Sequence, residues 1–326
     1  MKRSLVLLLI VVALLAHALT AEAQQQPKVA KIGWLGALSA TSDSGREFLR
    51  RELRALGYVE GKNIAFEYRY ANDKLDRLPA LADELVRLKV DALITPTGAT
   101  ALAAKNATKT IPIVFLNVGD PVAAGLVDSL PRPGGNVTGF TDINPVLAGK
   151  RLELLKETIP KLSRVAVLWN PEDASSTQQW KESQLPAREL SLQLHSMEVS
   201  SADKYERAFK EATKAGSAAL VVAGSPLALS NQKQIADLAK KNRLPAIGGR
   251  GDFVASGGLM SYGPERAESY RRTASMIDKI LKGAKPADIP VEQPTKFELM
   301  INLKAAKTLG LTIPPVVMMR AEKVIK

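Results

Sequence analysis

Apolar residues follow two alternating patterns along the chain. Short apolar or alternating runs predict strands at 29–35, 64–70, 92–95, 113–116 and 137–140. Between these runs, leucines recur at helical spacing, so that Leu49, Leu53 and Leu56 share one face of a helix that Gly57 ends. Ser44 and Glu47 predict a capping box at the start of that helix. Strands that alternate with helices are typical of parallel sheets with crossover helices, so the predicted fold class is α/β.

The pattern restarts near the middle of the chain. KVAKIGW at 28–34 opens the first half, and RVAVLW at 164–169 opens the second. Further strands are predicted near 192–199, 219–223, 245–247 and 259–262, with helices near 176–191, 204–215, 230–242 and 270–281. We therefore expect two α/β lobes joined by several connections. The N-terminal lobe covers 24–143, and part of 260–290 returns to it. The C-terminal lobe covers 144–326, mainly 144–258 and 291–326.

The first residues have the layout of a secretory signal peptide. Met1-Lys2-Arg3 is a positive start, 5–16 is an unbroken apolar run, and Ala21-Glu22-Ala23 matches an A-x-A cleavage site. The apolar run is too short to span a bilayer as a stable anchor. We expect cleavage of residues 1–23, a mature chain that begins at Gln24, and a periplasmic location. An uncleaved signal anchor is the alternative.

Composition narrows the classes of function. The chain has 0 cysteines, which excludes disulfides, thiolate catalysis and a lipid-modified cysteine anchor. The formal net charge is +12, but the lysines and arginines are interspersed with acids, as in RELRAL and KESQLPAREL. This spacing indicates a solvated basic surface, and we expect no nucleic-acid partner.

The sequence contains few groups that could carry out catalysis. Its 2 histidines are His17, in the predicted signal peptide, and His195, in a strand-like alternating run. Hydrolase triads and histidine-rich metal sites are therefore disfavoured. No G-x-G-x-x-G follows the first strand, and no P-loop motif occurs. We expect no enzyme activity, no cofactor and no metal; an exported enzyme that uses only carboxylates is the alternative.

Polar residues gather where the predicted strands end. Open α/β sheets bind ligands beyond the carboxyl ends of their strands. Hydroxyls and backbone amides near helix starts suit a carboxylate, and Asp120 suits an ammonium group, so together they suit an amino acid. The alternative is that each residue serves a turn or a helix cap. The candidate ligand-binding residues are Ser39, Ser42, Thr95, Thr97, Asn117, Asp120, Asn170 and Ser225.

Five stretches connect the chain with a known family. They are LRALGYVEGKNIAFEYRYA (53–71), IPIVFLNVGDPVAAGLV (111–127), RPGGNVTGF (132–140), GGLMSYG (257–263) and KILKGAKPADIPVEQPTKFELMINLKAAKTLGLTIP (279–314). In these stretches the chain resembles the substrate-binding proteins of ABC transporters, of the tryptophan/tyrosine type. The resemblance implies a type I periplasmic binding protein fold, in which two Rossmann-like lobes with parallel sheets are joined by a multi-strand hinge.

The resemblance also implies roles for the candidate residues. Characterised relatives bind aromatic amino acids in the cleft between the lobes. Carried over by position, the implied roles are a first-lobe loop lined by Ser39 and Ser42, a carboxylate site at Thr95 and Thr97, an ammonium site at Asp120, and second-lobe contacts from Asn170 and Ser225.

The expected function follows from this resemblance. We expect a monomeric periplasmic solute-binding component of an ABC importer, which delivers a small solute to a permease with its ATPase. The best candidate solute is an amino acid, with urea-like, peptide and aromatic-acid solutes as alternatives. A sensory module that passes its solute to a membrane receptor is the alternative function.

Overall fold

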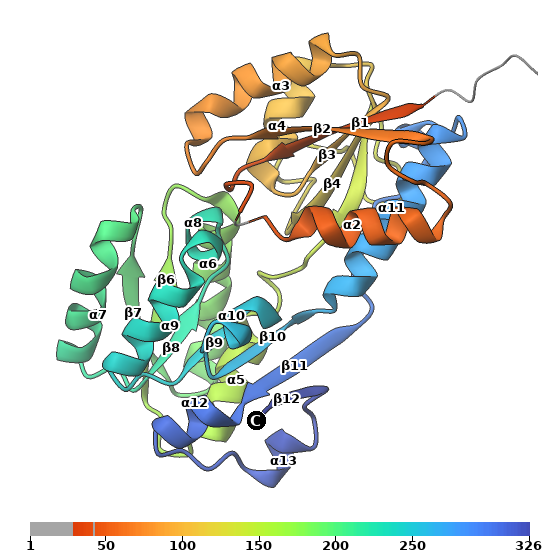
Figure 1. The fold of residues 1–326 in the computed structure, drawn as a ribbon. Coiled ribbons are helices and arrows are strands. Elements are labelled where there is room, and N and C mark those ends of the chain that lie inside the picture. Colours follow the sequence, from red (N-terminus) through yellow and green to blue (C-terminus); the bar gives the residue numbers. More distant parts are fainter. Residues whose placement is uncertain (1–28, 42) are drawn as a thin grey trace, which may run out of the picture.

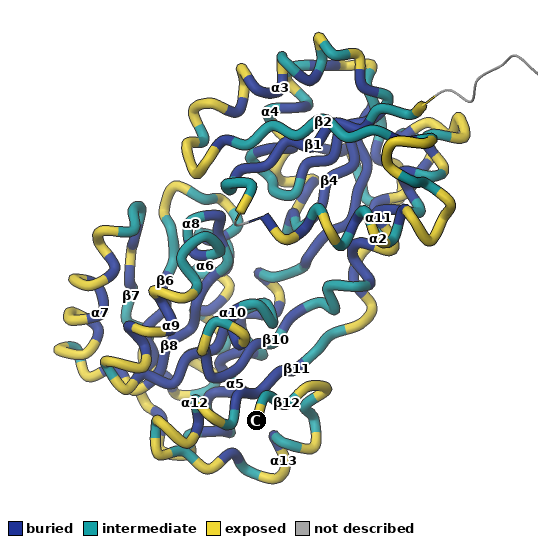
Figure 2. Tube along the Cα trace, viewed as in Figure 1, coloured by how far each residue is buried: buried dark blue, intermediate teal, exposed yellow. Residues whose placement is uncertain are grey.

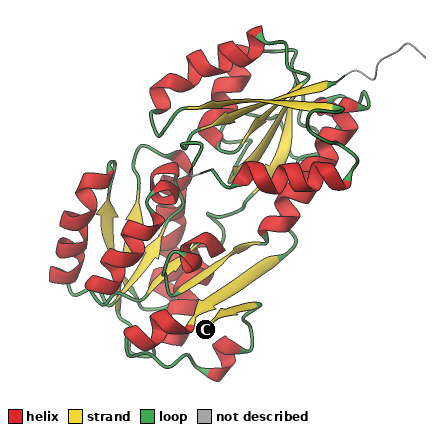
Figure 3. Ribbon diagram, in the orientation of Figure 1, coloured by secondary structure: helices red, strands yellow, loops and turns green. Residues whose placement is uncertain are grey.

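The computed structural model describes residues 29–41 and 43–326, and the chain there forms two β-sheets flanked by helices (Figures 1 and 3). The predicted signal peptide, Gln24 and Ser42 lie outside the described residues. The first sheet contains β1 (Ala30–Gly36), β2 (Ile64–Tyr70), β3 (Ala92–Thr95), β4 (Ile113–Val118) and β5 (Val137–Thr141). The second contains β6 (Arg164–Trp169), β7 (Gln193–Glu198), β8 (Ala219–Val222), β9 (Ala246–Gly248), β10 (Met260–Pro264), β11 (Phe297–Asn302) and β12 (Lys323–Ile325).

Both sheets are built almost wholly from parallel strands. The first has the order β2-β1-β3-β4-β5, and all its pairs are parallel. The second has the order β12-β11-β10-β9-β8-β6-β7, in which only the β10–β11 pair is antiparallel. Parallel strands joined by crossover helices are covered on both faces, which is why central strands such as β3 (ALIT) and β8 (ALVV) are mainly apolar, whereas the edge strand β2 (IAFEYRY) alternates.

Helices cover both faces of each sheet. The first sheet packs against α2 (Gly45–Ala55), α3 (Leu78–Arg87), α4 (Gly98–Ala107) and, from late in the chain, α11 (Arg266–Leu281). The second packs with α5 (Ala148–Thr158), α6 (Ala174–Glu189), α7 (Tyr205–Lys214), α8 (Pro226–Ser230), α9 (Gln232–Lys241), α10 (Gly251–Ala255), α12 (Leu303–Thr308) and α13 (Pro315–Met318). Short 3-10 helices are formed at η1 (Leu75–Arg77), η2 (Ala202–Lys204) and η3 (Pro286–Asp288). We call the first group of elements the N-lobe and the second the C-lobe.

The helix α11 joins the N-lobe because its apolar face completes that core. Tyr270, Ala274 and Ile277 are buried in the same cluster as Ile32 and Trp34 of β1. Figure 2 shows the buried residues running along the strands of both sheets, with exposed residues on the outer turns of the helices. Each sheet therefore carries an apolar core on each of its two faces.

Within the described residues, the chain crosses between the lobes in three places. The crossings are the segment 142–147 between β5 and α5, Glu265 between β10 and α11, and the segment 289–296 before β11. The third lies against β5, because Thr138 Oγ1 donates to the Ile289 carbonyl at 2.7 Å. The predicted domain boundary after residue 143 falls within the first crossing.

One local prediction is wrong. Ser44 does not cap α2 through its side chain; its backbone is already helical, and Asp43 Oδ1 instead accepts from the Gly45 N–H at 2.9 Å. A capping box does form at α4, between Thr97 and Thr100. The end of α2 agrees with its prediction, since Gly57 adopts a φ of +91° directly after the C-cap.

No helix within residues 29–41 and 43–326 combines the length and the apolar character that a membrane crossing needs.

Candidate ligand-binding site

A cavity of about 500 Å³ lies between the N-lobe and the C-lobe. On the N-lobe side its wall is formed by residues that follow β1 and β3 and by the end of β4. On the C-lobe side the wall is formed by residues that follow β8 and β9. We call this cavity the interlobe pocket. Its volume lies in the range of small-molecule sites, and its position matches the carboxyl-end rule for open α/β sheets.

Three of the predicted residues line the interlobe pocket: Thr97, Asn117 and Ser225. Thr97 and Ser225 are N-caps, whose hydroxyls accept from the N–H groups of Thr100 at 3.4 Å and Ala228 at 3.1 Å. Asn117, the penultimate residue of β4, has a φ of +51°, and its Nδ2 donates to the Pro96 carbonyl at 3.3 Å. The structure therefore brings one predicted residue from each of three strand ends to the same cavity.

Four predicted residues do not line the pocket. Asp120 is exposed, and its Oδ1 accepts from the N–H groups of Val122 at 3.1 Å and Ala123 at 2.9 Å, which are the contacts of a turn cap. Asn170 Oδ1 likewise accepts from the N–H of Glu172, at 3.0 Å. Thr95 is buried inside the sheet, and Ser39 contacts Thr41 on the surface. The eighth residue, Ser42, lies outside the described part of the chain.

Two buried aspartates, Asp43 and Asp142, and the partly buried Asp173 line the pocket instead. Burial raises the pKa of each carboxyl, and for Asp173 the pKa rises to about 6, because the low-dielectric interior disfavours the charged form. Polar neighbours partly offset this cost. Asp43 accepts from Trp34 Nε1 at 2.7 Å, and Asp173 accepts from the Ser176 N–H at 2.7 Å as the N-cap of α6.

Asp142 is held in the first crossing. Its two carboxylate oxygens accept from the backbone N–H of Asn144 at 3.0 Å and from Asn144 Nδ2 at 2.6 Å. Sequence reasoning missed Asp142, although it directly follows the last residue of β5, Thr141. The same rule about strand ends that selected Asn117 would have selected it.

A buried arginine connects the crossings with the pocket. Arg151 of α5 is 1% exposed; its Nε donates to the Tyr262 carbonyl at 2.9 Å, and Nη2 donates to Asn144 Oδ1. Nη1 donates to Gln179 Oε1, and that amide also accepts from the N–H of Gly224 on the pocket wall at 3.1 Å. Burial lowers the pKa of Arg151 to about 10, so it remains a cation at neutral pH. Arg151 and Arg250 are the nearby positive charges that favour the ionised form of Asp142.

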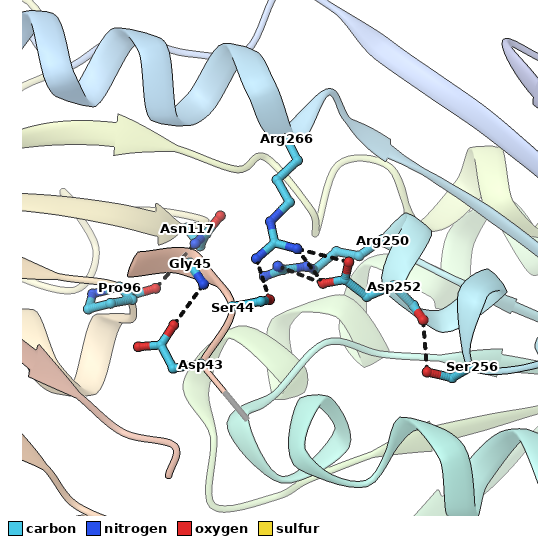
Figure 4. A network of polar contacts seen from close by, with 9 residues as sticks. All are labelled: Asp43, Ser44, Gly45, Pro96, Asn117, Arg250, Asp252, Ser256 and Arg266. Carbon is cyan, nitrogen blue, oxygen red and sulfur yellow. Dashed lines mark hydrogen bonds and ion pairs between the residues drawn. The ribbon is translucent and has the colours of Figure 1, made fainter. Parts of the chain in front are cut away.

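A second polar network also borders the pocket (Figure 4). Arg266, at the start of α11, contacts Asp252 of α10, and Arg250 contacts the same carboxylate. Phe48 and Tyr270 stack beside it, with ring centroids 5.5 Å apart. All five of these residues line the pocket. No group of three or more histidine, aspartate or glutamate side chains arranged to hold a metal occurs among the described residues.

Two lobes with parallel sheets that enclose a pocket at the strand ends define a type I periplasmic binding protein, which confirms the predicted fold class. The chain belongs to the ABC transporter substrate binding protein family, whose sequence profile matches residues 40–325. This confirms the family that the sequence motifs indicated.

Three relatives show how close the similarity is. The chain is 29% identical over 269 residues to the "Tyrosine-binding protein" of Clostridioides difficile (strain R20291), covering 82% of this chain and 77% of that protein. It is 28% identical to the ABC domain of Streptococcus pneumoniae in complex with L-Trp, with a TM-score of 0.84 over 91% of this chain and 99% of that chain. It is 26% identical to the ligand-free, open structure of CD0873 from C. difficile, with a TM-score of 0.66 over 91% of this chain and 100% of that chain.

The TM-scores of the S. pneumoniae and CD0873 structures indicate how the lobes of this chain are arranged. Sequence identity and coverage of this chain are nearly the same in both comparisons, yet the TM-score is higher for the L-Trp complex than for the open structure. The lobes of this chain are therefore arranged more like those of the ligand-bound relative.

Proposed function

We propose that this protein is the solute-capturing component of an ABC importer and that it takes an α-amino acid in the interlobe pocket. The observation that carries the proposal is that buried aspartates and the N-terminus of α4 border one pocket. The amino-acid ligands that the names of the C. difficile and S. pneumoniae relatives state support the same class of solute.

The ammonium group of the solute would lie at Asp142 and Asp43. Each carboxylate accepts two hydrogen bonds within the protein, and its four lone-pair sites leave room for further donors. Burial makes these charges costly in the empty pocket, and a cation would offset that cost. Asp120 has no part in this proposal, because its carboxylate already caps an exposed turn.

The carboxylate of the solute would lie at the start of α4. The first N–H groups of a helix have no acceptor within the helix, and they attract anions. Gly98, the first residue of α4, lines the pocket, and a Cβ added there would meet nothing within 4 Å. Thr97, Asn117 and Ser225 add polar groups around this point. The apolar part of the solute would contact Phe48 and Phe253, which suits an aromatic side chain.

Transport would follow from lobe closure rather than from covalent chemistry. A solute that binds the closed arrangement more tightly than the open one shifts the population toward closure. The closed protein would then dock on a membrane permease whose ATPase drives uptake. Export through the predicted signal peptide would place the protein where it meets the solute.

Native mass spectrometry of the purified protein, followed by thermal-shift screening against the L-amino acids, tests the class of solute. We expect a copurified amino acid or a stabilising one, with L-tryptophan and L-tyrosine as the first candidates. Stabilisation by other solutes alone would contradict the amino-acid proposal. Uptake of the radiolabelled amino acid by cells with and without the gene tests the importer role, and equal uptake would contradict it.

A further inference from the structure

One ion pair bridges the two lobes beside the interlobe pocket (Figure 4). Arg266 Nη1, in the N-lobe, lies 2.9 Å from both Oδ1 and Oδ2 of Asp252, in the C-lobe. The side chains are 18% and 36% exposed, so solvent screens the pair only in part. Within the described part of the chain, no other ion pair links the N-lobe to the C-lobe.

Arg266 is anchored to the N-lobe by contacts that do not involve the C-lobe. Its Nη2 donates to Ser44 Oγ at 2.7 Å. The guanidinium carbon lies 4.2 Å from the ring centroid of Phe48 and 5.6 Å from that of Tyr270. Stacking on aromatic rings fixes the plane of the guanidinium group. Arg266 is therefore oriented before the lobes meet, and little conformational freedom is lost when Asp252 arrives.

Asp252 also has a partner in its own lobe. Arg250 Nη2 lies 3.1 Å from Asp252 Oδ2. When the lobes separate, Asp252 keeps this partner and Arg266 keeps Ser44, so neither charge is left isolated. In the closed arrangement, in contrast, the Nε of Arg266 is buried without an acceptor. The pair therefore favours closure without making it irreversible.

Another contact between the lobes is weaker. Ser230 Oγ, in α8, donates to Asp73 Oδ1 in the N-lobe at 2.7 Å, and this hydrogen bond is exposed to solvent. An exposed hydrogen bond from one hydroxyl contributes less than a partly buried ion pair in which one guanidinium nitrogen contacts both oxygens of a carboxylate. The Arg266–Asp252 pair is thus the stronger of these two polar contacts between the lobes.

We propose that Arg266 is a positioning residue for solute capture, which holds the C-lobe against the N-lobe through Asp252 and so slows release of the bound solute. The effect on solute release rests on the proposed function, because it assumes an amino-acid solute. The effect on lobe closure does not depend on which solute binds. Since the pair forms only after the lobes approach, it should act on the dissociation rate much more than on the association rate.

The test uses Arg266→Gln, Asp252→Asn and the double variant. Arg320→Gln is the matched control, because Arg320 forms a partly buried ion pair with Glu157 that stays inside the C-lobe, with side chains 36% and 30% exposed. The chain has 0 cysteines, so Leu102→Cys on α4 and Lys210→Cys on α7 can carry two spin labels, one on each lobe. Pulsed electron paramagnetic resonance then gives the distribution of distances between the two spin labels, with and without L-tryptophan or L-tyrosine.

We expect each single variant to lower the closed population and to raise the dissociation rate of the bound amino acid about tenfold, with the association rate changed less than threefold. The double variant should match the single ones, since both remove the same contact. Wild-type distances in both single variants, additive effects, or an effect as large in Arg320→Gln would overturn the proposal. So would a wild-type protein with no closed population in either condition. If neither amino acid binds but the variants still shift the distances, the role of the Arg266–Asp252 pair in lobe closure is supported and the proposed solute is wrong.

Discussion

At the scale of single residues, burial separates the carboxylates that can meet a solute from those that cap turns. Asp120 follows a strand and looks as suitable in the sequence as Asp142 does. Their surroundings differ, because Asp120 is exposed and Asp142 is enclosed at the first crossing. Burial depends on what α5 and the C-lobe place around the residue, and no local pattern encodes that.

This difference in burial predicts that the same substitution, aspartate to asparagine, weakens binding at one position and not at the other. Asp142→Asn should weaken binding of the amino acid at least tenfold, because it removes the buried charge that would pair with the ammonium. Asp120→Asn should leave affinity unchanged, since an asparagine oxygen can accept the same two backbone hydrogen bonds. Isothermal titration calorimetry measures both. Loss of binding in Asp120→Asn with normal binding in Asp142→Asn would restore the interpretation drawn from the sequence.

Two glycines give a second pair of contrasting predictions. A Cβ on Gly263 would clash with the carbonyl oxygen of Gly249, so Gly263→Ala should lower the free energy of unfolding by about 1–3 kcal/mol. A Cβ on Gly98 would meet open space. Gly98→Ala should therefore leave stability unchanged but weaken amino-acid binding, because its methyl group enters the pocket. Urea unfolding and calorimetry check the two variants, and a stability loss confined to Gly98→Ala would be contrary to this account.

At the scale of elements, the sequence predicts those helices and strands that are long enough for their pattern of apolar residues to be recognised. The strands β1 to β6 and the helices α6, α7 and α9 lie close to their predicted bounds, because an apolar run, an alternation or several helical turns define each of them. The short α8, α10, α13 and β12 span three to five residues and carry no such period. Asp252, the partner of Arg266, lies on one of these short helices, α10, so the sequence could not indicate its position. Arg266 was missed because only the long-range return of α11 places it beside Phe48.

The start of α6 predicts a dependence of stability on pH. Burial raises the pKa of Asp173 from 3.8 to about 6, so between these values the folded protein binds a proton that the unfolded chain releases. The stabilisation that comes from this bound proton is therefore full below about pH 4. It is lost as the pH rises to about 6, which lowers the free energy of unfolding by at most about 3 kcal/mol. Asp173→Asn keeps the N-cap and should remove this part of the pH dependence.

Urea unfolding between pH 4 and pH 7 measures this effect. The gain of Asp173→Asn over the wild type should grow with pH through this window. Asp237→Asn on the exposed face of α9 is the control and should show no such change. A gain that does not vary with pH would contradict the proposed cause.

At the scale of the whole molecule, the repeated α/β pattern predicts two lobes, and the network around Arg151 explains how they are held. Arg151→Met should lower the free energy of unfolding by about 3–5 kcal/mol, because it leaves Asp142 and the carbonyl of Tyr262 without their buried cation. Arg320→Met, on the surface of the C-lobe, should cost less than about 1 kcal/mol. Equal costs in urea unfolding would show that Arg151 does not hold the crossings together.

The central claim is that one pocket between the lobes recognises both charged groups of an amino acid. Calorimetry with L-tryptophan, L-tyrosine and analogues that lack one group tests it most directly. Tryptamine and tyramine lack the carboxylate, and indole-3-propionate and 3-(4-hydroxyphenyl)propionate lack the ammonium. We predict that at least one amino acid binds and that both of its analogues bind about a hundredfold more weakly, because each leaves a buried polar group of the pocket unpaired. Equally tight binding of the analogue without the ammonium would contradict the role of Asp142 and Asp43, and with it the account of this site.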